Sequence, residues 1–254
     1  MIAGPIIELD EILRSGVGSG LHGIAIEGTD DHDEMGIFIE PMDVVLEVAS
    51  PVNHDVWRTQ PEGARSGPGD IDLVRYSLRK FMRLALKGNP TILLPLFAPV
   101  DALVIRTAAG EELRGLRSSI LSRSAGRRFR GYLHSQMRHL QRADTAPQRP
   151  ELVARHGFDT KFASHALRLA IQGVELMREG TIHLPMREDH LKRLRAIKMG
   201  EVPYGEVVDD VDRWSDALDG LLEGQEPSPL REAPDLAAVS GYMRRTHLAA
   251  WSAA

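Results

Sequence analysis

The sequence predicts an α+β protein, in which a small mixed sheet flanked by helices is followed by a mainly helical C-terminal domain. Two observations lead to this fold class. Short apolar segments bounded by glycine and proline, which are typical of strands, lie before residue 100. After Pro99 such segments become scarce, and longer segments with the 3.6-residue spacing of helices replace them. We therefore expect two domains, residues 1–105 and residues 106–254.

The first domain holds the expected strands. Residues 6–14 have helical spacing and end near Gly16, which predicts a helix followed by a glycine-rich turn. Residues 35–39 form an apolar run that ends before Pro41, as a buried strand does. Residues 44–48 fit either a second strand or a short helix.

A loop separates these segments from a further strand and helix. Residues 53–69 are rich in proline, glycine and serine, which indicates a loop with one short strand at residues 55–58. Residues 71–76 predict a strand, and residues 77–87 predict a helix that stops at Gly88.

The second domain is expected to be helical. Its helical patterns are interrupted at residues 143–150 and 179–185. Residues 160–178 predict a long helix, with Asp159 or Thr160 near its start.

The composition limits both the chemistry and the location of the chain. There is no cysteine among the 254 residues, so any metal ion must be held by carboxylates or histidines. His22, His54, His183 and His190 show no metal-ligand spacing. No apolar run is long enough to span a bilayer, and the first residues lack the pattern of a secretory signal. We therefore expect a cytoplasmic protein without a membrane partner.

Charge is unevenly distributed along the chain. The formal net charge is −5, yet residues 106–155 are rich in arginine and poor in acids. A basic segment in an acidic protein is typical of binding to a polyphosphate or a nucleic acid. A solvated helix surface paired with the acidic segments explains the same pattern, and both interpretations stay open. Tyr132 and Gln136 lie in this segment and fit either contact with a nucleic acid or ordinary packing.

An acidic segment precedes the strand expected at residues 35–39. If the strand starts near Asp31, Asp31 and Asp33 project from one face with their Cα atoms about 7 Å apart. Two such carboxylates suit a hard divalent cation such as Mg²⁺, which prefers oxygen ligands and completes its shell with substrate phosphates. Upstream, Gly18 and Ser19 belong to a turn whose bare backbone N–H groups can approach a phosphate. Taken separately, a solvated acidic loop and a plain turn also explain these features.

The order of these features resembles the nucleotidyltransferase signature of the DNA polymerase β superfamily. That signature is an apolar residue, Gly-Ser, a spacer, and Asp-x-Asp leading into a strand, and here it reads Val17-Gly18-Ser19 and then Asp31-His32-Asp33. His32 departs from the apolar or aromatic residue usual at the x position. The resemblance implies a polymerase β-like mixed sheet, catalytic metal-binding carboxylates at Asp31 and Asp33, and an NTP whose phosphates contact Gly18 and Ser19.

Further segments resemble one family of that superfamily, the RNA-repair-associated RlaP-like type. They are residues 72–81 with 84–90, residues 157–161 with His165 and Arg168, and residues 194–200 with Tyr204. The resemblance covers most of residues 15–205, and it implies that Asp72 is the third carboxylate and that Lys80 contacts the nucleotide. Asp70 is the alternative, because a strand would place it on the same face as Asp72. A plain helix cap is the other interpretation of Asp72.

Four polar residues share one side of the helix expected at residues 160–178. They are Lys161, His165, Arg168 and Gln172, spaced at i, i+4, i+7 and i+11. A mostly apolar helix carries such a stripe where something anionic faces it, either an acid of the protein itself or a nucleotide triphosphate. The family resemblance favours the triphosphate, with Lys161, His165 and Arg168 as the binding residues.

Together these features predict a metal-dependent nucleotidyltransferase. We expect Mg²⁺ or Mn²⁺ at Asp31, Asp33 and Asp72, and transfer of a nucleoside monophosphate from an NTP to an acceptor hydroxyl with release of pyrophosphate. The arginine-rich segment and the repair-associated relatives favour an RNA 3′ end as the acceptor. The alternatives are nucleotidyl modification of a protein or small-molecule hydroxyl, and a nucleotide-binding regulatory module with a degenerate site.

Overall fold

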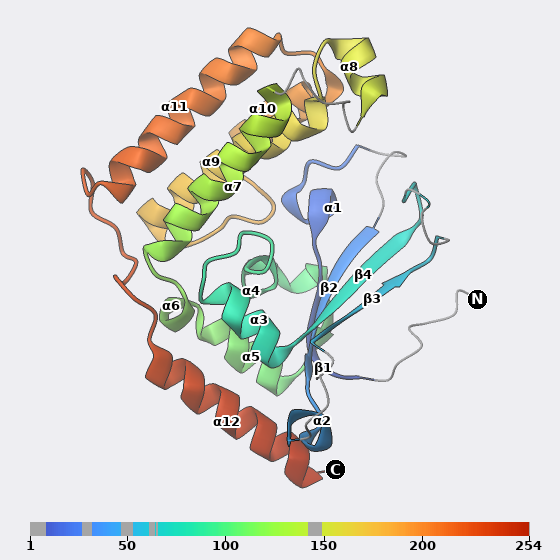
Figure 1. Ribbon diagram of the computed structural model, residues 1–254, viewed down its shortest axis with the longest axis vertical. Coiled ribbons are helices and arrows are strands. Elements are labelled where there is room, and N and C mark those ends of the chain that lie inside the picture. Colours follow the sequence, from blue (N-terminus) through green and yellow to red (C-terminus); the bar gives the residue numbers. More distant parts are fainter. Residues whose placement is uncertain are drawn as a thin grey trace. The chain divides into compact units, whose positions relative to one another are not determined.

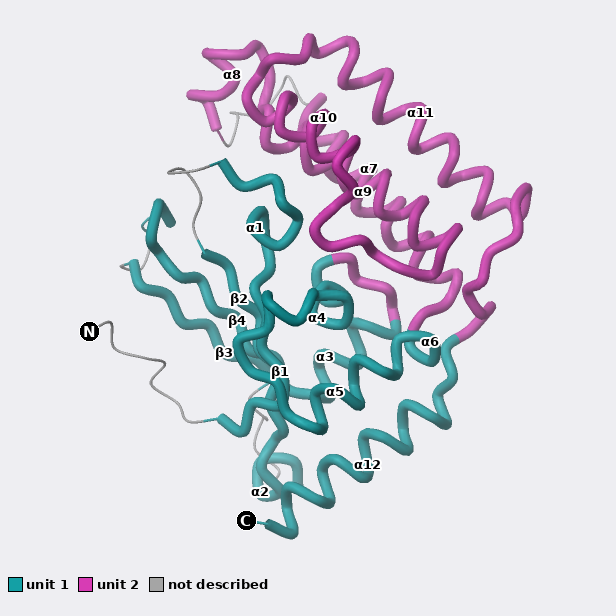
Figure 2. Tube along the Cα trace, turned by 180° about the vertical axis from the view of Figure 1, so that it is seen from behind, with its two compact units in different colours: residues 1–86, 91–120, 234–254 teal, residues 87–90, 121–233 magenta. Residues whose placement is uncertain are grey.

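The computed structural model describes residues 9–26, 32–46, 53–60, 64, 66–141 and 149–253 (Figure 1). Asp31, the first of the predicted carboxylates, lies outside the described residues. The chain forms two compact units (Figure 2). Unit 1 comprises residues 1–86, 91–120 and 234–254, and unit 2 comprises residues 87–90 and 121–233. The division at residue 105 stays a prediction about which parts of the chain fold independently.

Unit 1 is built on a five-stranded mixed sheet with the strand order β3-β4-β2-β1-β5. The strands are β1 Asp10–Gly16, β2 His32–Ile39, β3 His54–Arg58, β4 Ile71–Ser77 and β5 Leu103–Arg106. β2 and β4 run parallel, and the other neighbouring strands are antiparallel. The expected fold class, a mixed sheet with helices and a helical C-terminal part, is confirmed.

Several helices complete unit 1. In the described part of unit 1 they are α1 Gly18–His22, α2 Met42–Leu46, α3 Leu78–Ala85, α4 Leu94–Phe97, the 3₁₀ helix Val100–Ala102, α5 Ala108–Gly115, α6 Arg117–Ile120 and α12 Leu236–Ala253. α3, α4 and α5 lie on the same side of the sheet (Figure 1). A Cβ atom on Gly110 of α5 would lie 3.2 Å from the Cβ of Leu13, so the covered face is the one that carries Leu13 and its β2 partner Ile37. Both of these side chains are fully buried.

Unit 2 is helical in its described part. Its helices are α7 Ser124–Gln141, α8 Pro150–His156, α9 Thr160–Glu179, α10 Glu188–Met199 and α11 Tyr204–Leu222. The helix expected at residues 160–178 is confirmed as α9, against which α7, α10 and α11 pack (Figure 2). Gly173 of α9 allows this close packing, because a Cβ atom there would lie 3.0 Å from Leu218 Cδ2 and 3.2 Å from Phe129 Cβ. In the described part of the chain, no helix has the length and apolarity needed to cross a bilayer.

Two segments near the sheet differ from the sequence expectation, and a third follows one of its two alternatives. The helix expected at residues 6–14 is wrong for its described part, because β1 occupies Asp10–Gly16. β1 has hydrogen-bonded strands on both sides, and these long-range pairs override the helical spacing of the local sequence. Residues 44–46 belong to α2, which is the helix alternative, and residues 47 and 48 lie outside the described residues. β5 was not expected, although its run of leucine, valine and isoleucine favours a strand.

Candidate active site

Two of the three predicted carboxylates are neighbours across parallel strands. Asp33 is the second residue of β2 and Asp72 the second residue of β4, and the two are direct register partners. Partners in adjacent strands have Cα atoms about 5 Å apart and project from the same face. Asp33, Met35 and Ile37 are every second residue of β2, so their side chains share the face that the helices cover. Both carboxylates therefore lie on this face, at the N-terminal ends of the two strands.

Gly18 leaves the space that the Asp33 carboxylate occupies. Its φ of 65° is in the left-handed region, and a Cβ atom on it would lie 2.0 Å from Asp33 Oδ2. The Val17 N–H donates to the Asp33 carbonyl oxygen at 2.8 Å and holds this segment on β2. Both conformation and space therefore require glycine at position 18. Ser19 follows it, partly exposed, in the short helix α1, where the sequence had indicated a turn.

The Asp72 carboxylate is held by side chains from β3 and from the segment before β4. Gln60 Nε2 donates to Oδ1 at 2.8 Å, and the Ser66 hydroxyl donates to Oδ2 at 2.6 Å. Arg58 Nε lies 3.5 Å from Oδ1. A carboxylate has about four acceptor positions, so these contacts orient Asp72 and still leave oxygen lone pairs for a ligand.

Asp70, the alternative third carboxylate, has a different position. It precedes β4, where Oδ1 accepts from the Thr59 hydroxyl at 3.0 Å and Oδ2 accepts from the Gly67 N–H at 2.9 Å. These bonds close the loop between β3 and β4. The register with Asp33 therefore favours Asp72 as the third carboxylate.

The interpretation of Asp72 as a helix cap is wrong. Asp72 lies inside β4, five residues before the cap of the following helix. That cap is Ser77, whose hydroxyl accepts from the Lys80 N–H at 3.2 Å.

The donor set of this site suits a hard divalent cation. Asp33 and Asp72 supply carboxylate oxygens, and within the described structure the buried Gln60 Oε1 has no hydrogen-bond partner. Mg²⁺ prefers such oxygen ligands and is commonly bound through one or two carboxylates together with substrate phosphates. The described residues, which do not include Asp31, contain no group of three or more His, Asp or Glu side chains placed to hold a metal ion.

Lys80 lies away from the two carboxylates. Its ammonium is 5.4 Å from the centroid of the Tyr76 ring. Tyr76 is four residues beyond Asp72 in β4, which corresponds to about 13 Å along the strand. The structure thus brings Gly18, Asp33 and Asp72 together. Lys80 in α3 lies near Tyr76, at the other end of β4. Its contact with the nucleotide stays a prediction.

The predicted phosphate-binding residues lie in unit 2, in the first half of α9. Lys161 is exposed, while His165 and Arg168 are partly buried. Arg168 Nη1 donates to Gln172 Oε1 at 3.0 Å. Asp159 caps the helix by accepting from the Lys161 N–H at 3.0 Å.

The charges around His165 are positive. Burial, followed by the nearby charges of Arg168, Lys161 and Arg149, lowers the pKa of His165 to about 3. Burial also lowers the pKa of Arg168 to about 10, which leaves this residue charged at neutral pH. His165 is therefore a neutral side chain inside a cationic cluster. Arg149 was not predicted as a member of this cluster, because it precedes α9 and lies outside the helical spacing of Lys161, His165 and Arg168. Its Nη1 pairs with the Asp159 carboxylate at 3.2 Å.

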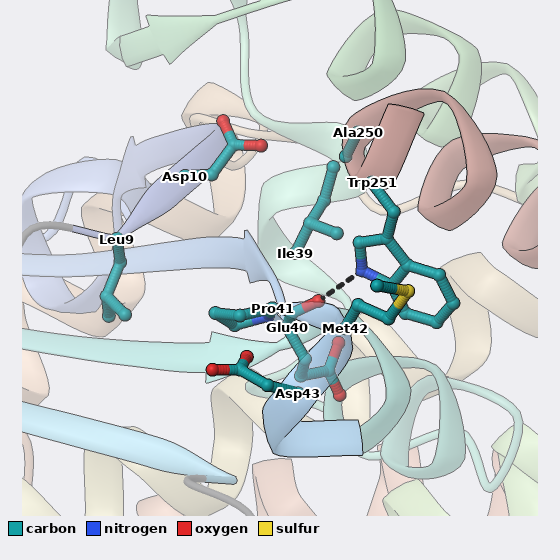
Figure 3. A pocket seen from close by; sticks show the side chains of 9 residues that line it. All are labelled: Leu9, Asp10, Ile39, Glu40, Pro41, Met42, Asp43, Ala250 and Trp251. Carbon is teal, nitrogen blue, oxygen red and sulfur yellow. Dashed lines mark hydrogen bonds between the residues drawn. The ribbon is translucent and has the colours of Figure 1, made fainter. Parts of the chain in front are cut away.

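A separate cavity of about 370 Å³ lies at the other end of β2 (Figure 3). It is lined by Leu9, Asp10, Ile39, Glu40, Pro41, Met42, Asp43, Ala250 and Trp251. The Trp251 indole N–H donates to the Glu40 carbonyl oxygen at 2.8 Å (Figure 3). Ile39 is six residues from Asp33, about 20 Å along the strand, so this cavity is not part of the carboxylate site.

A mixed sheet with paired strand carboxylates beside a Gly-Ser segment is the arrangement of the nucleotidyltransferases of the DNA polymerase β superfamily. Over residues 9–245 the chain matches RlaP, the RNA repair pathway DNA polymerase beta family. The chain belongs to that family, and it is thereby a nucleotidyltransferase. Nucleotidyltransferases generally use an NTP and divalent metal ions.

Other comparisons add little to this assignment. A solved structure described as a nucleotidyltransferase-like protein from Exiguobacterium sibiricum 255-15 has 11% sequence identity and a TM-score of 0.29, over 85% of this chain and 70% of that chain. A likeness of this strength carries no argument about function. None of the curated proteins matches the chain.

Proposed function

We propose that this nucleotidyltransferase moves a nucleoside monophosphate from an NTP to the 3′ hydroxyl of an RNA acceptor. The observation that carries the proposal is the pairing of Asp33 with Asp72 against Gly18, in a chain of an RNA repair family. The acceptor oxygen forms a bond to the α-phosphorus, and the bond from that phosphorus to the oxygen bridging to the β-phosphorus breaks. The hydroxyl proton passes to water, and pyrophosphate leaves.

The carboxylates provide the negative charge that is needed to bind divalent cations at the reaction site. Asp31, Asp33 and Asp72 would hold Mg²⁺ or Mn²⁺. A divalent cation bound there supplies stabilisation of the phosphoryl oxygens and lowers the pKa of the acceptor hydroxyl. Asp33 keeps its position against Gly18, and Asp72 is oriented by Gln60, so neither carboxylate must reorganise during the reaction.

The phosphates of the NTP are assigned to two sets of residues. Gly18 and Ser19 contact the β- and γ-phosphates through backbone N–H groups and the serine hydroxyl. Lys161 and Arg168 neutralise charge that builds up on the leaving pyrophosphate. His165, whose pKa of about 3 keeps it neutral, contributes a hydrogen bond rather than a charge.

A transfer assay tests this proposal. Purified protein is incubated with Mg²⁺ or Mn²⁺, each labelled NTP in turn, and total RNA. Asp33→Asn and Asp72→Asn are each expected to lower the rate of labelling by roughly 10²–10³-fold, because each removes a charge that stabilises the transition state. Asp70→Asn is the matched control, since Asp70 closes the loop before β4, and it is expected to keep most of the activity.

Each other outcome points to a different conclusion. Full activity in Asp33→Asn or Asp72→Asn contradicts the proposed carboxylate site. Label on the protein itself or on small molecules indicates another acceptor than RNA. No label anywhere, together with no NTP binding by calorimetry, indicates a regulatory module with a degenerate site.

A further inference from the structure

α7 carries an exposed row of residues that the proposed reaction does not use. The row, called the α7 row below, consists of Arg127, Gly131, His134, Arg138 and Gln141. Its members are spaced at i, i+4, i+7, i+11 and i+14, so they share one side of the helix over about 21 Å. All five are exposed, while Phe129 and Leu133 on the opposite side are fully buried.

The α7 row differs from an ordinary solvated helix face. Such a face usually interleaves acids with bases, but Ser124–Gln141 contains no Asp or Glu. Arg130, beside the row, pairs with Asp219 at 2.8 Å. Arg127 and Arg138 form no ion pair within the described part of the chain. Because the whole chain has a net charge of −5, this row is a local positive surface that attracts a polyanion the rest of the chain repels.

A groove of about 500 Å³ lies beside residues 131–141 of α7, so it includes four of the five members of the α7 row but not Arg127. It is lined by Gly131, His134, Met137, Arg138 and Gln141. The space beside Gly131 is open, because no atom lies within 4 Å of the position a Cβ atom would take. Glycine weakens a helix interior, so Gly131 adds no stability there, and it leaves room in the groove wall for close approach of a ligand.

Ring contacts link the C-terminal end of α7 to the cationic cluster of α9. The His139 ring stacks on Phe162 with a centroid distance of 5.4 Å, and the Arg149 guanidinium lies 5.0 Å from the centroid of the same ring. Arg149 also acts on His165, and Lys161 precedes Phe162 in α9. Within unit 2, these ring contacts therefore connect the end of α7 to the residues assigned to the pyrophosphate.

We infer that the α7 row binds the phosphate backbone of a single-stranded RNA whose 3′ end is the acceptor; this inference rests on the proposed function. Arg127 and Arg138 contact phosphates, and the groove at Gly131 admits the backbone between them. Such contacts hold the strand without reading its sequence.

Base stacking on Tyr132 is not part of this surface. The Tyr132 hydroxyl accepts from Asn89 Nδ2 at 2.9 Å, and the Arg128 guanidinium lies 5.4 Å from the centroid of its ring. These contacts give Tyr132 a packing role, which was one of its two interpretations. Recognition is therefore expected to be electrostatic and tolerant of base sequence.

The test measures RNA binding separately from transfer. Full-length Asp33→Asn protein is titrated against a dye-labelled single-stranded RNA, without NTP, at a series of salt concentrations. Replacing both Arg127 and Arg138 by Gln is expected to weaken binding about tenfold or more at low salt. The slope of log K against log salt should fall by about 1.4, since each phosphate contact on a single strand contributes about 0.7. Arg130→Gln, which removes an arginine already paired with Asp219, should change neither quantity.

A second pair of variants examines the groove. Gly131→Glu places a carboxylate on its wall and is expected to weaken RNA binding about tenfold. Gly115→Glu is the matched control, because Gly115 is an exposed glycine of α5 that also has no atom within 4 Å of its Cβ position. Its affinity for RNA should equal that of the parent protein. Circular dichroism confirms that each variant keeps its helical content.

The possible results separate this inference from the proposed reaction. Unchanged affinity and salt slope in the double Gln variant overturns the inference, as does equal displacement of RNA by poly-glutamate of matched charge. Binding that depends on the row, with no transfer to RNA by the wild-type protein, supports the RNA surface and refutes only the reaction. Transfer to RNA that is independent of the row supports the reaction and overturns the surface.

Discussion

At position 18 only glycine leaves room for the Asp33 carboxylate. A Cβ atom there would overlap Asp33 Oδ2, and the φ of 65° is unfavourable for any residue with a side chain. Gly18→Ala is expected to lower the free energy of unfolding by about 1–3 kcal/mol because of strained backbone. It should also lower the transfer rate by about 10²-fold, because a small displacement of a catalytic group is costly. Urea unfolding and the transfer assay measure the two effects.

Gly20 is the control for the stability effect. It lies in the same helix α1, and a Cβ atom on it would meet nothing within 4 Å. Gly20→Ala is expected to leave the free energy of unfolding unchanged or to raise it by up to about 1 kcal/mol. If Gly18→Ala were as stable and as active as the wild-type protein, Asp33 would not depend on the space at Gly18.

His165 shows how a residue type can suggest the wrong charge. Its place in a stripe with Lys161 and Arg168 indicates a cationic group. Burial and the neighbouring cations instead hold its pKa at about 3, so His165 is neutral at physiological pH. The positive charge of the cluster then comes from Lys161, Arg168 and Arg149.

At the scale of elements, one buried ion pair joins α12 to the end of β2. His247 Nε2 lies 3.1 Å from Glu40 Oε2, and its Nδ1–H donates to the Met243 carbonyl oxygen at 2.7 Å. The hydrogen bond to Glu40 raises the pKa of His247, although burial and the charge of Arg79 oppose this. Burial raises the pKa of Glu40, but hydrogen bonds from His247 and Ser77 outweigh it and leave the pKa below its ordinary value.

This pair makes the stability of unit 1 depend on pH. The pair stabilises unit 1 fully at pH values between 4.5 and 6.5, which are the ordinary pKa values of Glu and His. This stabilisation falls as the pH rises through the raised pKa of His247, and as the pH drops through the lowered pKa of Glu40. His247→Ala is expected to lower the free energy of unfolding by about 3 kcal/mol near pH 6, because Glu40 is left buried without its partner. Urea unfolding at a series of pH values measures both effects.

His247→Gln separates the charge from the hydrogen bond. The amide can still donate to Glu40 but does not titrate, so this variant should lose the fall in stability above pH 6.5 that is expected of the wild-type protein. An unchanged pH profile in His247→Gln would assign that fall to another group.

At the scale of the whole molecule, the chain leaves unit 1 after residue 120 and returns to it at residue 234. The returning helix α12 contributes Tyr242, which is fully buried and whose hydroxyl donates to the Ala109 carbonyl oxygen at 2.9 Å. Deleting residues 234–254 is therefore expected to destabilise unit 1 by at least about 3 kcal/mol, comparable to the loss of one buried aromatic residue. Unit 2 should be much less affected.

Tryptophan fluorescence can follow the two units separately. Trp57 lies in β3 of unit 1 and Trp214 in α11 of unit 2, and Trp251 is removed with α12. In the shortened chain, Trp214→Phe leaves a reporter for unit 1, and Trp57→Phe leaves one for unit 2. The unit 1 transition should move to lower urea than the unit 2 transition. If both moved equally, α12 would stabilise the chain as a whole.

The family, the fold class and several elements could be predicted from the sequence alone. The strands expected at residues 35–39 and 71–76 and the helix expected at residues 160–178 all occur in the structure. These segments were predictable because the spacing of apolar residues within each one already specifies which face is buried. The order of Gly-Ser and Asp-x-Asp is likewise local, so it identified the superfamily and the candidate carboxylates without any knowledge of distant contacts.

Contacts between residues far apart in the sequence could not be predicted in this way and became visible in the folded chain. The parallel register of β2 and β4 pairs Asp33 with Asp72 across 39 positions of sequence, and sheet pairing on both sides makes residues 10–16 a strand despite their helical spacing. The return of α12 to unit 1 and the position of Arg149 beside His165 are of the same kind. Local spacing cannot encode them, because strand register and helix packing are set by the free energy of burying whole surfaces against each other rather than by neighbours along the chain.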